Sequence, residues 1–126
     1  MNKITKDNLD EFIKYYHSFH DSCITNINYD ILESRIEFLI DVFWSGVPIL
    51  KDDNTYETNK VKMRLILNKV EQCNNKEMFS YDFINEVFIK YIKLGNKEFI
   101  CFASDEKEPL IYIVCESIEY EEIKEN

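Results

Sequence analysis

The residues of this chain that could carry out chemistry are concentrated between Tyr15 and Cys23, in the stretch YYHSFHDSC. Both histidines of the chain lie there. Residues three or four positions apart share a helix face, so His17, His20 and Asp21 could hold a metal ion, and Cys23 would be a fourth ligand. The sequence has no H-E-x-x-H motif and no third histidine, whereas closed zinc sites use four nitrogen or sulfur ligands at recognisable spacings. We therefore treat a metal site as the alternative and expect none.

Nucleophilic catalysis is a second chemistry for this stretch, with Ser22 or Cys23 as nucleophile and His20 as base. Positions 20 and 22 would face the same side of a strand. The sequence contains no G-x-S-x-G motif, and its two glycines leave little scope for a backbone loop around a phosphate or an oxyanion. We expect a protein that is not an enzyme and has no cofactor. A small metal-dependent or Cys/His hydrolase centred on the same residues remains the alternative.

The stretch also has a purely structural interpretation. The apolar residues follow a helical period that ends at Tyr16, and a two-residue period begins at Ser22. Short polar side chains such as Ser18 and Asp21 can bond backbone groups that are left free where a helix gives way to a strand. The His20-Asp21 pair is also similar to that of metal-dependent phosphohydrolases, but those proteins are helical and need a further histidine well upstream. The structural interpretation is the one that we favour.

The elements around this stretch indicate a single domain over residues 1–126, of the α+β class and mainly β. Residues 5–18 predict a helix with Thr5 as its N-cap. About six antiparallel strands follow, and short connections favour pairing in chain order, in a curved meander sheet or a two-layer sandwich. A helical turn is expected near residues 78–84, and Gly95-Asn96 predicts a hairpin. The alternating segments that predict the strands are 22–30, 35–44, 61–70, 97–104 and 109–122. Residues 84–94 fit either a helix or a strand, and their β-branched content favours a sixth strand.

Charge and composition exclude several classes of function. The chain carries a net charge of −9, which repels phosphate backbones and disfavours nucleic-acid binding. Residues 104–126 hold eight acids against two lysines, a formal charge of −6, which reads either as solvated surface or as a surface for a basic partner. The N-terminus has no apolar run for a signal peptide, and no segment is long enough to span a membrane. Without C-x-x-C spacing, the four cysteines are expected to be reduced thiols in a cytoplasmic protein.

The longest irregular segment, residues 45–60, is where we expect contacts with a partner. Gly46 and Pro48 break regular structure, and acidic turn residues follow them. Residues 47–50 are apolar, so burial in the core is the alternative for them. The residues predicted to bind a protein partner are Trp44, Val47, Pro48, Ile49, Asp105, Glu106 and Glu108.

The segments FHDSCITNINYD and RIEFLID, within residues 19–42, resemble the start of a group of small bacterial β-rich domains. These domains begin with His-Asp-Ser or His-Asp-Ala, followed by an alternating strand and a second amphipathic strand. Some are assigned as immunity proteins that neutralise toxins in bacterial competition. The resemblance implies a cytoplasmic binding protein, with His20-Asp21-Ser22 as a signature of the fold and a basic toxin as the partner. A homodimer formed through an edge strand is a further alternative.

Overall fold

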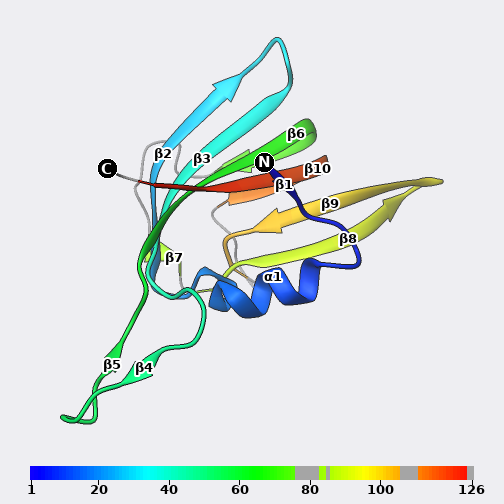
Figure 1. Ribbon diagram of the computed structural model, residues 1–126. Coiled ribbons are helices and arrows are strands. Elements are labelled where there is room, and N and C mark those ends of the chain that lie inside the picture. The colour runs from blue at the N-terminus through cyan, green and yellow to red at the C-terminus, as the bar shows by residue number, and fades with distance from the viewer. Residues whose placement is uncertain (76–82, 85, 106–110, 125–126) are drawn as a thin grey trace.

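Figure 1 shows the computed structural model of the protein, which describes residues 1–75, 83–84, 86–105 and 111–124. The described residues form mainly strands and one short helix, so the protein is α+β and mainly β, as the sequence predicts. The elements are β1 (Asn2–Lys3), α1 (Leu9–Tyr15), β2 (Ser22–Asp30), β3 (Arg35–Val42), β4 (Ile49–Leu50), β5 (Tyr56–Glu57), β6 (Val61–Asn75), β7 (Phe83–Ile84), β8 (Phe88–Leu94), β9 (Lys97–Ala103) and β10 (Ile111–Ile123).

One antiparallel sheet contains most of these strands, in the order β7-β2-β3-β6-β10-β9-β8, and β1 pairs with the far end of β10. All six predicted strands appear, as β2, β3, β6, β8, β9 and β10. Pairing in chain order holds within β2-β3-β6 and within β8-β9-β10. It is wrong between these two meanders, because β6 pairs with β10 and not with β8. The connection between β6 and β8 is long, so proximity in the chain does not force those strands together.

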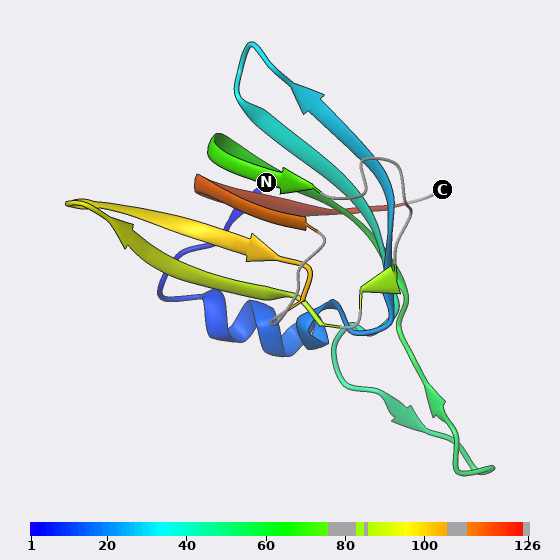
Figure 2. The same ribbon diagram turned by 180° about the vertical axis from the view of Figure 1, so that it is seen from behind.

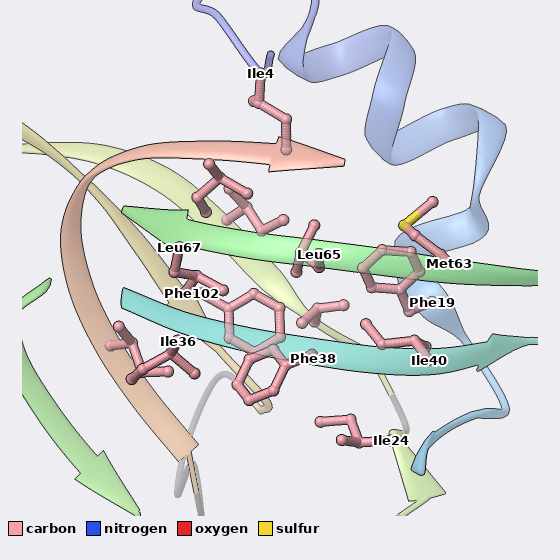
Figure 3. Packing of buried hydrophobic residues seen from close by; sticks show 14 of the residues in the cluster. Ile4, Phe19, Ile24, Ile36, Phe38, Ile40, Met63, Leu65, Leu67 and Phe102 are labelled. Carbon is pink, nitrogen blue, oxygen red and sulfur yellow. The ribbon is translucent and has the colours of Figure 1, made fainter. Parts of the chain in front are cut away.

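The sheet bends until its two halves face each other. Adjacent strands lie about 4.8 Å apart, so a flat sheet would separate β3 from β9 by about 14 Å. The ring centroids of Phe38 on β3 and Phe102 on β9 are only 5.4 Å apart. Figure 3 shows these two rings meeting at the centre of the core, with Leu65 and Leu67 of β6 beside them. The concave side of the bent sheet is therefore the hydrophobic core.

Helix α1 covers one side of this core through aromatic side chains. The ring of Phe12 lies 4.6 Å from that of Tyr120 on β10 and 5.7 Å from that of Phe19. The Tyr16 hydroxyl donates a hydrogen bond to the Glu122 carboxylate at 2.8 Å. Burial raises the pKa of Tyr16, and the neighbouring carboxylate adds to this effect. The phenol therefore stays a hydrogen-bond donor and ties the helix to the end of β10.

Helix α1 is shorter than the prediction over residues 5–18. It begins after Asn8, and Thr5 precedes it: the Thr5 N–H donates to Asn8 Oδ1 at 2.8 Å, and the Asn8 N–H donates to Thr5 Oγ1 at 3.3 Å. The helix ends at Tyr15 because the three residues His17–Phe19 all have φ between 51° and 55°. A right-handed helix cannot contain such residues. The helical period in the sequence extends further than the helix itself.

A β-bulge in β2 changes which residues face the core. One extra residue, Thr25, lies between the Ile24 and Asn26 pairs of the ladder with β3. The inward face is therefore Ser22 and Ile24 before the bulge and Ile27 after it. A bulge inserts one residue and reverses the alternation that follows it. Without the bulge, Cys23, Thr25, Ile27 and Tyr29 would all lie on one face of the strand.

The segment before β8 also departs from the sequence prediction. Phe83 and Ile84 form β7, which pairs with the start of β2, where a helical turn near 78–84 was expected. The rest of that expected turn, residues 78–82, lies outside the described residues. β8 is a strand that pairs with β9 along its whole length.

The Phe38–Phe102 contact yields a test of the curvature. Replacing Phe38 with alanine removes a fully buried ring at the point where the two halves of the sheet meet. We expect Phe38→Ala to lower the free energy of unfolding by about 3–5 kcal/mol, because it leaves a cavity in a packed core. Urea denaturation followed by circular dichroism measures the change. The matched control is Leu32→Ala, whose side chain is 96% exposed, and it should change stability by less than about 0.5 kcal/mol. Equal effects of the two variants would contradict the described packing.

Candidate functional site

The YYHSFHDSC stretch forms a left-handed turn between α1 and β2. His17, Ser18 and Phe19 have positive φ, and so does Asp21, at 59°. Each such residue costs about 1–2 kcal/mol when it is not glycine. The turn is held in place from both sides: the Phe19 side chain is fully buried, and the Val87 N–H donates to the Ser18 carbonyl at 2.8 Å. A strained conformation of this kind persists only where its surroundings over-determine it.

Gly46 is fixed against this turn by two hydrogen bonds. The His17 Nε2–H donates to the Gly46 carbonyl at 2.7 Å, and the Gly46 N–H donates to the Tyr15 carbonyl at 2.8 Å. Gly46 has a φ of +67°, and a Cβ built on it would lie 3.7 Å from the Tyr15 ring. The positive φ favours glycine at this position, because a residue with a Cβ is strained there. The chain therefore leaves the body of the protein at a defined point beside the end of α1.

Asp21 and Ser22 hold the two residues that follow β3. The Trp44 Nε1–H donates to the Asp21 carboxylate at 3.3 Å, and the Phe43 N–H donates to Ser22 Oγ at 3.2 Å. Ser22 is completely buried. These polar side chains thus bond a distant segment, residues 43–46, where the sequence predicted bonds to the helix-to-strand junction itself. The contacts that they make are structural, but the partner segment differs from the expected one.

The alternative chemistries are not assembled in this conformation. Ser22 is out of reach of any substrate, and its hydroxyl accepts the Phe43 N–H. His20 Nε2 lies 3.4 Å from the Asp21 carboxylate on the surface, whereas Cys23 points to the other side of β2 from Ser22. Within the part of the chain that the structure describes, no three side chains of the metal-binding types lie together. The structure therefore does not bring His17, His20, Asp21 and Cys23 into one site.

Residues 47–58 form a projection that we call the arm. β4 pairs only with β5, with Ile49 opposite Glu57, and the arm extends away from the sheet and α1 (Figures 1 and 2). Its turn is fixed by the Lys51 N–H, which donates to the Thr55 carbonyl at 2.7 Å. Hydrogen bonds from Thr55 also lower the pKa of Asp53 in this turn. At its base, the Ser45 hydroxyl donates to the Asn59 carbonyl at 2.7 Å and closes the two ends of the arm together.

The arm carries most of its apolar side chains in solvent. Val47 is 89% exposed, Ile49 64%, and Leu50 and Tyr56 59% each. Core burial, the alternative for residues 47–50, therefore does not hold for three of the four, and Pro48 is partly exposed. Exposed apolar side chains that cluster on one projection commonly mark an interaction surface. Trp44, which the sequence also predicted as a contact, is half-buried at the base of the arm.

A groove of about 850 Å³ lies between the arm and α1. The sequence did not predict that α1 contributes to this surface. Tyr15 is the residue that could have indicated this, because it is a large aromatic residue that lies outside the buried stripe of the helix formed by Phe12 and Tyr16. The lining residues are Glu11, Lys14 and Tyr15 of α1 and Ser45, Gly46, Val47, Ile49, Glu57, Thr58 and Asn59 in or beside the arm.

Of the three acidic residues predicted as contacts, the structure describes only Asp105. Asp105 is exposed just beyond β9, and Glu106 and Glu108 lie outside the described residues. The acids of β10 belong to the sheet: Arg64 Nη1 lies 2.7 Å from Glu121 Oε1. A hydrogen bond from Lys97 lowers the pKa of Glu116. Within the described residues, the acids of the C-terminal segment thus lie mostly on β10. The carboxylates that line the groove are Glu11 and Glu57.

Comparison of the chain with models of protein families, with curated proteins and with solved structures gave no match. Within the described residues, no helix has both the length and the apolar character that crossing a membrane requires.

The bond between His17 and Gly46 can be tested by its effect on the arm. His17→Ala removes the donor to the Gly46 carbonyl, and we expect a loss of about 1 kcal/mol in the free energy of unfolding. Hydrogen–deuterium exchange should also become faster at residues 45–59, because the base of the arm loses a fixed point. The matched control is His20→Ala, whose contact with Asp21 is at the surface and should contribute less than about 0.5 kcal/mol. A larger effect of His20→Ala than of His17→Ala would mean that the cluster serves another purpose.

Proposed function

We propose that this protein is a cytoplasmic, non-enzymatic binding protein that holds a protein partner against its arm, and that it belongs to the immunity type, which neutralises a toxin. The observation that carries the proposal is the exposure of Val47, Ile49 and Leu50 on a projection with a fixed base. A surface that is already ordered before binding loses less entropy when a partner docks. Binding through the arm therefore needs no folding step.

The resemblance of residues 19–42 to immunity-type domains supports the same proposal. The triplet His20-Asp21-Ser22 carries that resemblance, and two of its members bond the segment at the base of the arm. A sequence signature that positions a binding element would be expected in domains that share a way of binding. The immunity role itself rests on the resemblance and is the part of the proposal that a partner must establish.

Charge supports a basic protein as the partner. A net charge of −9 speeds the approach of a positively charged protein and repels phosphate backbones and anionic lipid surfaces. The same charge opposes association between two copies of the chain. Light scattering at several concentrations tests the homodimer alternative. A dimer that disappears when the arm is altered would make a second copy the occupant of this surface.

The proposal predicts that capture of a partner depends on the arm. We expect Ile49→Ser/Leu50→Ser to lower the affinity for a partner co-expressed from the neighbouring genes at least tenfold, because two exposed apolar contacts are lost. Isothermal titration with the purified pair measures the affinity. If the partner is a toxin, the same variant should fail to protect growing cells.

The matched control for this experiment is Ile31→Ser/Leu32→Ser. These two aliphatic residues are 87% and 96% exposed at the β2–β3 turn, at the opposite end of the molecule from the arm (Figure 1). The control replaces the same two residue types, which are more exposed here than in the arm, and should leave affinity and protection unchanged. If the control loses binding and the arm variant keeps it, the arm is not the contact surface.

A further inference from the structure

The groove between α1 and the arm is lined by both apolar and acidic side chains. Its lining includes the aromatic side chain of Tyr15 from α1 and the apolar side chains of Val47 and Ile49 from the arm. Glu11 stands on the helix wall and Glu57 on the arm wall, and both are exposed. Among the described residues, neither carboxylate takes part in an ion pair. Two carboxylates that make no ion pair among the described residues therefore line one groove together with apolar side chains.

In this respect the two groove carboxylates differ from several carboxylates of the sheet. On the outer face of the sheet, Glu116, Glu121 and Glu98 each pair with a lysine or an arginine. Lys14, the one cation that lines the groove, is exposed on α1 and makes no ion pair within the described residues. The lining as a whole has one more negative than positive charge, and it belongs to a strongly acidic chain. The charge that would complement this groove is positive.

We propose that the groove receives an arginine-bearing apolar segment of the partner, with the guanidinium group between Glu11 and Glu57. This inference rests on the proposed function, because it names the chemistry of the partner at the same surface. Arginine is favoured over lysine because its planar guanidinium can bond a carboxylate through two N–H groups and stack on an aromatic ring such as Tyr15. The apolar residues that flank the arginine contact Val47 and Ile49.

The geometry of the groove suits a segment of this kind. Pockets that bury small ligands span about 300–1,000 Å³, so a groove of about 850 Å³ accommodates a few residues. Both walls are held in place, because Gly46 bonds to Tyr15 and His17 on the helix side, and Ser45 bonds to Asn59 at the base. The backbone at the base of the arm is therefore fixed against the end of α1 before the partner arrives.

The test uses the full chain and two synthetic peptides that differ at one position. One peptide is Ac-Gly-Leu-Arg-Leu-Gly-amide, and the other carries glutamine in place of arginine. Titrations followed by NMR chemical shifts measure each dissociation constant and locate the contact. We expect the arginine peptide to bind at least fivefold more tightly and to shift the amides of Glu11, Tyr15, Val47 and Glu57. Equal affinities of the two peptides would overturn the inference.

Charge reversal separates a local contact from general electrostatic attraction. Glu57→Lys should weaken binding of the arginine peptide about fivefold and leave the glutamine peptide unchanged. The matched control is Glu33→Lys, which changes the net charge by the same amount at the β2–β3 turn, at the far end of the molecule (Figure 2). Equal losses from both variants would show attraction to net charge alone and would contradict a site in the groove.

The same titrations distinguish failure of the inference from failure of the proposed function. If both peptides bind with one affinity and both are lost in Ile49→Ser/Leu50→Ser, the arm is an apolar docking surface and the arginine site is wrong. If Ile49→Ser/Leu50→Ser changes neither peptide binding nor capture of the co-expressed partner, the proposed function of the arm fails as well.

Discussion

The antiparallel ladder between β6 and β10 joins the two halves of the sheet, and the core and the helix both depend on it. These are the two longest strands, and the ladder runs from Ile111 opposite Asn75 to Ile123 opposite Lys62. On each face of this ladder, the side chains of β6 and β10 are of complementary types. Ile118 lies opposite the buried Leu67 on the inner face, and Glu121 is paired with Arg64 on the outer face. Cross-strand pairs of this kind are the unit of sheet stability.

The curvature of the sheet sets the positions of the core, of α1 and of the arm. Because the sheet bends, β3 and β9 face each other and enclose Phe38 and Phe102. The open side of the bend is then covered by α1, which packs Phe12 on Tyr120. The position of α1 in turn places the left-handed turn after it against residues 43–46. The arm is therefore anchored to the core through a chain of packed and bonded elements.

The backbone strain of the left-handed turn is offset by the contacts that hold the base of the arm. Its positive-φ residues cost about 1–2 kcal/mol each, whereas burial of one large side chain such as Phe19 returns about 1.5–3 kcal/mol. The hydrogen bonds to Gly46, Phe43 and Trp44 offset more of the strain. What results is a rigid base for an arm whose own side chains are largely unpacked. A net charge of −9 opposes association of two copies of the chain through such an apolar projection.

The sequence by itself determined the class of the fold and the six main strands, because alternation records which residues face solvent on each strand and is a local property. It also located the segment that became the arm, because Gly46 and Pro48 interrupt that alternation. Tertiary structure alone decided the pairing of β6 with β10, the bulge at Thr25 and the exposure of Val47, Ile49 and Leu50. It also decided that His17, Asp21 and Ser22 bond residues 43–46, and that α1 forms one wall of the groove. The physical reason is the same in each case: these features depend on contacts between segments far apart in the chain, and a run of apolar residues looks alike in sequence whether a distant strand covers it or water does.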